Sequence, residues 1–264
     1  MATEYPNAAT DIGSSHPAIR TIGTADLKDA LAKGLDDFKA KPSHIVLLVA
    51  IYPIVGLVAA RLAAGYDLLP LVFPMVSGFA LIGPLAAIGL YELSRRRELG
   101  LEISWDHAFN VIRFRSLGSI VTLSVLLGAI YLAWLGAAQA IYWLTFGSAV
   151  PESIAEFARQ VITTPAGWSL IIVGCGVGFV FALVVLAISA VSFPMLLDRD
   201  VGAMVAVQTS VNAFRANPKT MAMWGIIVAG SLVIGSLPLF VGLAVVMPVL
   251  GHATWHLYRK VVEN

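Results

Sequence analysis

Residues 221–259 read MAMWGIIVAGSLVIGSLPLFVGLAVVMPVLGHATWHLYR, which is 39 residues without Asp, Glu, Lys or Arg before the final arginine. A single helix of this length would reach about 58 Å, nearly twice the thickness of a bilayer's hydrocarbon core. The stretch must therefore fold back, and Gly235-Ser236-Leu237-Pro238 predicts where it turns. We expect it to form two membrane-spanning helices.

Four more apolar runs upstream are long enough to cross a membrane, and they are Ile45–Ala64, Leu68–Leu90, Leu117–Leu144 and Trp168–Leu197. The composition agrees, because 58% of the 264 residues are hydrophobic and only 12% are charged, with a mean hydropathy of +0.84. The sequence therefore predicts an all-α polytopic membrane protein with six transmembrane helices.

The positive charges predict how these spans are oriented. With the N-terminus inside, all of the 17 Lys and Arg except Arg61 and Arg159 fall on the inner side. We expect a protein of the bacterial inner membrane with both termini in the cytoplasm. The clusters at the inner ends of spans two and six are expected to anchor those ends, and they comprise Arg95, Arg96, Arg97, Arg259 and Lys260. Residues 1–23 are polar, lack the apolar core of a signal peptide, and are predicted to be a flexible cytoplasmic tail.

The sequence also repeats itself. Pro74, Gly78, Ala80, Pro84, Leu93 and Arg95 recur without a gap as Pro238, Gly242, Ala244, Pro248, Leu257 and Arg259, and Phe38–Pro42 recurs as Phe214–Pro218. We interpret residues 24–262 as one membrane domain of three units, at 24–98, 99–199 and 200–262. Each unit is expected to be a cytoplasmic amphipathic helix followed by a transmembrane hairpin.

Apolar side chains at helical spacing mark these amphipathic helices. The first places Leu27, Leu31, Leu35 and Phe38 on one face, the second begins at Ser104, and the third aligns Met204, Val207, Val211 and Phe214. The outer loop at 145–167 departs from the pattern and is expected to contain a short helix after Pro151-Glu152.

Three runs resemble a known family. They are Gly83–Glu92 (GPLAAIGLYE), Ser192–Arg199 (SFPMLLDR) and Gly251–Arg259 (GHATWHLYR), and they are similar to the bacterial family filed as domain of unknown function 2189. The resemblance covers roughly residues 25–262, with the closing His-x-x-x-His run as its most specific part. It implies a multi-pass membrane fold and no established activity, although some members carry a cytochrome c oxidase label.

His252 and His256 form the only metal-like spacing, since residues i and i+4 share one helix face and both imidazoles could reach one ion or haem iron. No carboxylate or cysteine accompanies them. The alternative is a pair of interfacial histidines bonded to carbonyls or lipid headgroups. A haem-copper catalytic subunit needs intramembrane histidines on several helices, which this sequence lacks. No cofactor is predicted, and this pair is the only candidate for haem or metal.

Other residues are predicted to have structural roles. Gly174 and Gly178 form a Gly-x-x-x-Gly pair that permits close helix packing, within the chain or with another subunit. Pro74, Pro84, Pro238 and Pro248, with Gly78 and Gly242, are expected to kink or interrupt spans two and six.

No Walker motif, Gly-x-Ser-x-Gly, His-Glu-x-x-His or pair of catalytic carboxylates occurs, so the sequence does not indicate an enzyme. The net charge of +1 argues against nucleic acid as a partner. We expect a non-catalytic accessory or assembly component of a membrane complex, with the lipid bilayer and other inner-membrane proteins as its partners. The alternative is a carrier or channel for a neutral or apolar solute, suggested by the broken helices.

Overall fold

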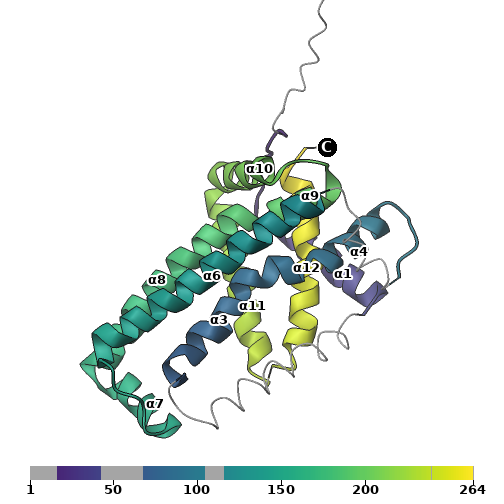
Figure 1. Ribbon diagram of the computed structural model, residues 1–264. Coiled ribbons are helices and arrows are strands. Elements are labelled where there is room, and N and C mark those ends of the chain that lie inside the picture. Colours follow the sequence, from purple (N-terminus) through teal and green to yellow (C-terminus); the bar gives the residue numbers. More distant parts are fainter. Residues whose placement is uncertain (1–16, 43–67, 105–115, 239, 264) are drawn as a thin grey trace, which may run out of the picture.

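The computed structural model describes residues 17–42, 68–104 and 116–263, apart from Leu239. In chain order the helices are α1 (Thr24–Ala40), α3 (Leu69–Ala86), α4 (Ile88–Glu98), α6 (Leu117–Phe146), α7 (Ile154–Thr163), α8 (Pro165–Ser189), α9 (Ser192–Asp198), α10 (Ala203–Ala216), α11 (Pro218–Ser236) and α12 (Leu243–Val261) (Figure 1). The predicted all-α class is confirmed for this part of the chain. Span one at 45–64 and most of the amphipathic helix expected from Ser104 lie outside the described residues.

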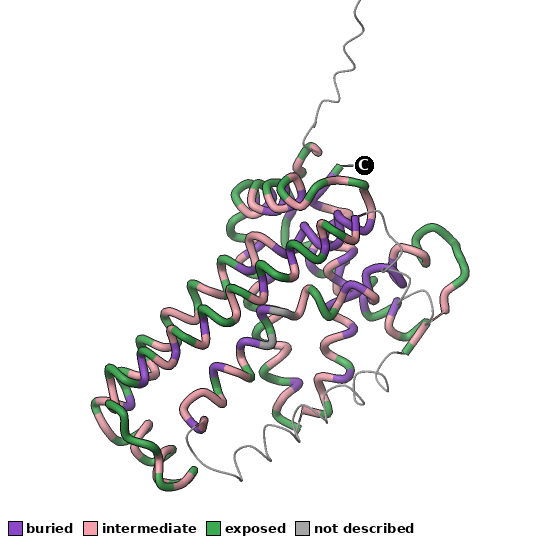
Figure 2. Tube along the Cα trace, viewed as in Figure 1, coloured by how far each residue is buried: buried purple, intermediate pink, exposed green. Residues whose placement is uncertain are grey.

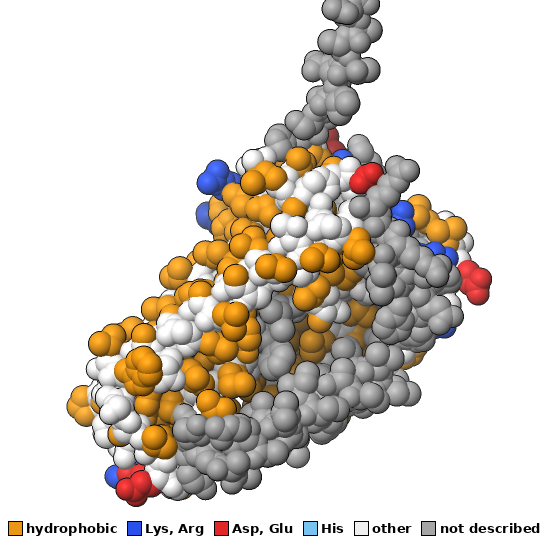
Figure 3. Space-filling model, viewed as in Figure 1, with side chains coloured by type: hydrophobic (Ala, Val, Ile, Leu, Met, Phe, Trp, Pro, Cys, Tyr) orange, Lys and Arg blue, Asp and Glu red, His pale blue; other side chains and the backbone are white. Residues whose placement is uncertain are grey.

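Three of the described segments are long and apolar enough to cross a membrane. They are Leu117–Phe146, Pro165–Asp198 and Pro218–Ser236, which correspond to α6, α8 with α9, and α11. Large apolar side chains cover α6 and α8, and the visible acidic and basic side chains gather toward the two ends of the molecule (Figure 3). An apolar flank of this kind is expected where helices face lipid or another membrane protein.

The turn predicted in the long apolar stretch is present. Helix α11 ends at Ser236 and α12 begins at Leu243, and the two helices pack against each other. Their backbones come close at two glycines, because a Cβ atom on Gly242 would lie 2.7 Å from the carbonyl oxygen of Gly235. Only residues without side chains permit so tight a hairpin.

The two proline-bearing copies have different helical layouts. Helix α3 runs through Pro74 and Gly78, and the chain breaks at Ala87 before α4. Helix α12 instead begins after Gly242 and continues through Gly251, the position matching Ala87. At that position Gly251 packs against Leu90 of α4, where a Cβ would lie 2.6 Å from the leucine Cδ1. The sequence repeat therefore does not translate into identical helices in the described part of the chain.

Helix α1 buries mostly small residues that lie outside its leucine stripe. Ala30, Gly34 and Asp37 are buried, and of the stripe Leu27 is buried while Leu35 is 39% exposed. The cause is the close crossing of α1 over α12, where a Cβ on Gly34 would lie 2.6 Å from the amide nitrogen of Ala253. Small residues allow this approach, and a row of leucines would hold the two helices apart.

Helix α10 has a similar pattern of burial. Its buried residues are Ala206, Thr209, Ser210 and Ala213, whereas Met204 is 69% exposed and the valines and Phe214 are half-buried. Both helices thus turn small residues toward the bundle and, apart from Leu27, leave the bulky apolar residues of their stripes half-buried or exposed.

Residues 17–23, at the end of the predicted tail, contact the helices. Ile19 and Val262 form an isolated antiparallel bridge, and Asn217, just before α11, accepts a 2.8 Å hydrogen bond from the amide of Ile22. Buried residues concentrate at this end of the molecule, around α9 and α12, and become sparser along α6 and α8 (Figure 2). Helix α7, at the opposite end, buries none of its residues.

Candidate functional site

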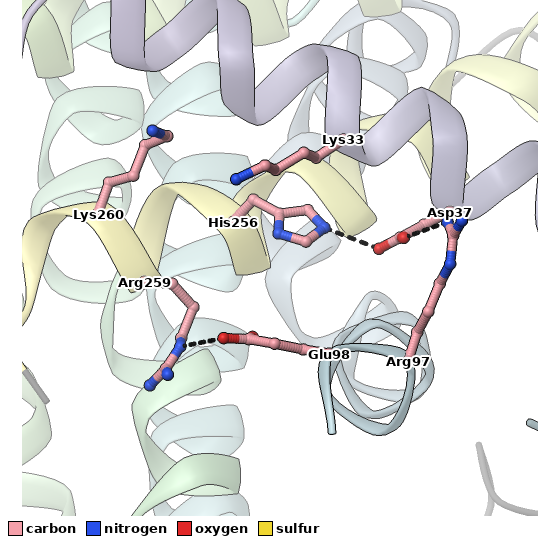
Figure 4. Close-up of a pocket in the computed structure, with 7 residues that line it drawn as sticks. All are labelled: Lys33, Asp37, Arg97, Glu98, His256, Arg259 and Lys260. Carbon is pink, nitrogen blue, oxygen red and sulfur yellow. Dashed lines mark hydrogen bonds and ion pairs between the residues drawn. The ribbon is translucent and has the colours of Figure 1, made fainter. Parts of the chain in front are cut away.

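Asp37 is the centre of a cluster of polar side chains between α1, α4 and α12. Its position follows from the register of α1, since it is ten residues after Leu27 and shares the buried face with Ala30 and Gly34. The side chain is 8% exposed. Its carboxylate accepts a hydrogen bond from Ser94 Oγ at 2.6 Å. It also accepts bonds from Arg97 Nη1 at 2.6 Å and His256 Nε2 at 2.8 Å (Figure 4).

His252 extends this cluster into the interior. Its Nδ1 lies 2.7 Å from Ser94 Oγ, and the residue is 1% exposed. When Ser94 gives its single proton to Asp37, Nδ1 of His252 must be the donor to Ser94. The Nε2 atom then carries a lone pair, and it is buried without a hydrogen-bond partner. We refer to Asp37, Ser94, Arg97, His252 and His256 as the Asp37 cluster.

The charge of Asp37 is retained despite its burial. Burial alone raises the pKa of a carboxyl group, but the hydrogen bonds from His256 and Ser94, with the nearby histidine charges, outweigh it and lower the pKa of Asp37 below its usual 3.8. Asp37 is therefore ionised at neutral pH, with Arg97 and His256 as its partners. A buried carboxylate is tolerated only with such partners.

The predicted anchor residues surround the cluster and are held by carboxylates. On α4, Arg95 lies 3.4 Å from Glu92, and Arg97 contacts Asp37. On α12, Arg259 lies 3.0 Å from Glu98 and 3.2 Å from Asp198. Lys260, also on α12, lies 2.9 Å from Asp29 and 3.2 Å from Asp26. Arg96 donates to the carbonyl of Glu102 at 2.8 Å. Most of these pairs join different helices, so the positive residues connect α1, α4, α9 and α12 at one end of the bundle.

An open pocket of about 420 Å³ adjoins the cluster. Its wall is formed by Lys33 and Asp37 of α1, Arg97 and Glu98 of α4, and His256, Arg259 and Lys260 of α12 (Figure 4). Three helices distant in sequence therefore contribute to one concave surface. Such a pocket is where a ligand would be sought first.

The two histidines proposed from spacing do not converge on one point. His256 bonds to Asp37, and His252 bonds to Ser94. Within the described residues, no group of three or more His, Cys, Asp and Glu side chains is arranged to hold a metal ion. Ser94 is 1% exposed, and its hydroxyl lies between Asp37 and His252, so it does not face a space that a substrate could enter.

The predicted structural residues have separate local roles. The carbonyl of Pro74 accepts a 2.9 Å hydrogen bond from Trp134 Nε1, and Gly78 leaves room for the ring of Tyr131, so both fit α3 against α6. Pro84 lies within α3 shortly before its end, and Pro248 is buried within α12. Pro238 and Gly242 belong to the turn between α11 and α12.

The two glycines of the Gly-x-x-x-Gly pair differ in whether they pack against another helix of the same chain. A Cβ on Gly178 would lie 3.0 Å from the ring of Trp134, so this glycine serves packing inside the chain. Gly174 and Gly176 have open space around them, and Cys175 between them is exposed. Cys175 and Gly176 therefore place small residues on the exposed side of α8.

Sequence reasoning missed Asp37 and Ser94. The leucine stripe is the stronger apolar signal in α1, and it places Asp37 on a polar face of the helix. The available clue was a second stripe, in which Ala30 and Gly34 share a face with Asp37. Small residues followed by an acid at helical spacing indicate close packing against a polar partner.

Comparison with protein families agrees with this membrane architecture. The model of a family described as "Predicted integral membrane protein (DUF2189)" matches residues 72–198, which is slightly less than half of the chain. The chain resembles the DUF2189 family. It is an integral membrane protein with several apolar helices. No curated protein and no solved structure matches the chain.

The DUF2189 match is narrower than the span expected from sequence. It includes Gly83–Glu92 and most of Ser192–Arg199, but it ends before Gly251–Arg259, the run that we expect to be the most specific. Of the Asp37 cluster it includes Ser94 and Arg97, and it leaves out Asp37, His252 and His256. The candidate site is therefore assembled from both matched and unmatched parts of the chain.

Proposed function

We propose that this chain is a non-catalytic protein of the bacterial inner membrane that serves as an accessory or assembly component of a membrane complex. The proposal rests on one observation: the polar groups of the Asp37 cluster bond to each other inside the bundle, whereas the outer surface of α8 is apolar and exposed. Ser94 bonds to both Asp37 and His252 inside the bundle, whereas α8 exposes Ile172 and Phe179 on the same face as the open Gly176. Small residues among large apolar ones suit the approach of another membrane helix.

We further propose six spans with both termini in the cytoplasm. Its support is the separation of charge along the bundle. Ion pairs join the ends of α1, α4, α9 and α12 at one end, and Arg159 on α7 lies at the other, bonded to Glu156 at 2.7 Å. A positive end of this kind is typical of the cytoplasmic side.

The three-unit organisation is part of the proposal and has two supports. Helices α1 and α10 end at matching residues, Ala40 and Ala216, and bury the matching pairs Ala30 and Ala206, Gly34 and Ser210, and Asp37 and Ala213. In the second half of each unit, an aromatic side chain is buried in a helix near the charged end, and these are Tyr91, Phe193 and Trp255. Equivalent positions with equivalent burial are expected of repeats.

Partner binding can be tested through the native cysteine. In membranes treated with a thiol-reactive cross-linker, Cys175 should give a defined heterologous product, and mild-detergent purification should recover the same partner in stoichiometric amount. Replacing Gly176 with leucine should reduce recovery at least tenfold, because the side chain would fill the proposed contact. Leucine at Gly230, which also lies in open space but on α11, is the matched control. A single monodisperse species under several gentle conditions would contradict the proposal.

Topology can be tested with single cysteines on a Cys175→Ser background. With a membrane-impermeant thiol reagent and intact spheroplasts, Ser14→Cys, Ser104→Cys and Asn264→Cys should be protected, and Ser153→Cys should be labelled. Labelling of Ser104→Cys with protection of Ser153→Cys would reverse the orientation.

The two alternatives drawn from sequence stay predictions. A carrier or channel would require a polar path beside Pro84 and Pro248. Haem or metal binding at His252 and His256 would give a haem spectrum or about one bound metal ion per chain, lost on replacement of both histidines with alanine.

A further inference from the structure

The wall of the pocket between α1, α4 and α12 is rich in positive charge. Its cations are Lys33, Arg97, Arg259 and Lys260, set against the carboxylates of Asp37 and Glu98. They come from three helices, so the arrangement exists only in the folded chain. Two of the cations are well exposed, with 53% of the Lys33 side chain and 40% of the Arg97 side chain accessible.

The two lysines share one carboxylate. Asp29 lies 3.1 Å from Lys33 Nζ and 2.9 Å from Lys260 Nζ, and Asp26 lies 3.2 Å from Lys260 Nζ. These pairs are at the surface, where an ion pair contributes little to stability and is readily exchanged. An incoming anion could therefore bond to either lysine without breaking a buried contact.

The two carboxylates of the wall are already committed. Asp37 is held by Ser94, Arg97 and His256, and Glu98 accepts from Trp255 Nε1 at 2.9 Å and from Arg259 Nε at 3.0 Å. Each therefore already accepts hydrogen bonds from positively charged or polar neighbours. Figure 4 shows Lys33 and Lys260 on the same side of the pocket, above His256.

The pocket also lies at the positive end of the bundle. Basic pockets between membrane helices on the cytoplasmic side bind the headgroups of anionic lipids. Phosphate oxygens are suited to several cations at once, with ammonium groups as point charges and guanidinium groups as paired donors. We infer that this pocket binds a phosphate ester through Lys33 and Lys260, with Arg259 at its edge. This inference does not depend on the proposed partner binding.

The experiment uses the full chain, purified in an uncharged detergent and freed of lipid. Binding is measured by calorimetry with three probes, which are dihexanoyl phosphatidylglycerol, dihexanoyl phosphatidylcholine and glycerol 3-phosphate. We expect phosphatidylglycerol to bind and phosphatidylcholine to bind at least tenfold more weakly. Equal binding of glycerol 3-phosphate identifies a soluble phosphate ester as the source, and its failure to bind identifies a lipid headgroup.

Variants assign the binding to the pocket. Lys33→Gln should weaken binding by about tenfold, because it removes one charged hydrogen-bond donor, and Lys33→Arg should largely restore it. Lys28→Gln changes the same charge on an exposed position of the same helix and should leave binding unaltered. Lys260→Gln should act like Lys33→Gln. Three results would overturn the inference. They are equal binding of phosphatidylglycerol and phosphatidylcholine, no binding of either phosphatidylglycerol or glycerol 3-phosphate, and unchanged binding in Lys33→Gln.

Discussion

Helices α1 and α10 use the same packing geometry with different chemistry. Both bury a small-residue face and expose a bulky apolar one, and Gly34 of α1 corresponds to Ser210 of α10. Against its neighbour, α10 relies on hydroxyl groups, since Ser210 Oγ accepts a 3.3 Å bond from the amide of Val191 and Ser192 Oγ donates to the carbonyl of Ala206 at 3.2 Å. Helix α1 instead places a charged side chain, Asp37, where α10 has Ala213.

This difference indicates that separate residues determine how closely a helix packs against the bundle and how strongly it is held there. The small residues decide how closely each helix approaches the bundle. Asp37 makes the attachment of α1 depend on its hydrogen bonds with Arg97 and His256, whereas α10 has no charged residue at the matching position. The attachment of α1 should therefore respond to charge changes, and that of α10 should not.

The largest effect is expected from Asp37→Ala. Removing the carboxylate leaves Arg97 and His256 without their buried partner, and breaking a buried pair in this way costs about 3–5 kcal/mol. Unfolding of the purified protein in mixed micelles with increasing denaturing detergent measures the loss. Asp36→Ala, at the exposed neighbouring position, is the control and should change stability by less than about 0.5 kcal/mol. Equal effects of the two variants would show that Asp37 does not hold α1.

A somewhat smaller effect is expected from Gly34→Leu. A Cβ here already meets the backbone of Ala253, and overpacking of this kind costs about 1–3 kcal/mol. The variant should also increase thiol labelling of a cysteine placed at Leu27, which is 1% exposed in the native protein. Unchanged labelling and stability would mean that α1 does not cross α12 at Gly34.

The counterpart on α10 is Ser210→Ala. This change removes the acceptor for the amide of Val191 while keeping the small volume, and it should cost about 1 kcal/mol. The same denaturation measurement applies, with Asn212→Ala at an exposed site of α10 as the control. A loss as large as that of Asp37→Ala would remove the distinction between the two helices.

The smallest effect concerns pH. Because the pKa of Asp37 is lower in the folded protein than its ordinary 3.8, its ionisation stabilises the fold above that value, and the contribution is lost as pH falls through the folded pKa. The stability difference between the native protein and Asp37→Asn should be constant from pH 7 to about pH 5 and should shrink below about pH 4. A difference that grows on acidification would show that the pKa of Asp37 is raised.

The sequence predicts those features that depend on length and hydropathy. The turn after Gly235 could be placed because residues 221–259 are too long and too free of charge for one span. The match of the chain to a family of predicted integral membrane proteins and the all-helical class of the described residues follow from the same signal.

The candidate site could not be predicted, because its contacts join residues from three different helices. The hydrophobic periodicity of a sequence describes each helix on its own. The pattern of α1 contains two overlapping stripes, and hydropathy favours Leu31 and Leu35 over Ala30 and Gly34. Pairing of Asp37 with Ser94 and His256 depends on how closely three helices approach, which is decided by Gly34, Gly251 and their neighbours. The positions at which the helices break in the two proline-bearing copies also depend on such tertiary contacts.

The bond between Asp37 and His256 joins residues that are 219 positions apart, and this separation has a consequence for biosynthesis. At roughly 5–20 residues per second, α1 is synthesised about 10–45 s before the helix that covers its buried face. During that interval Asp37 has neither His256 nor the Val249–Ala253 surface to pack against. Leu31, Leu35 and Phe38 give the waiting helix an apolar face with which to rest on the membrane surface. Helix α12 must therefore be synthesised before α1 can form its native contacts.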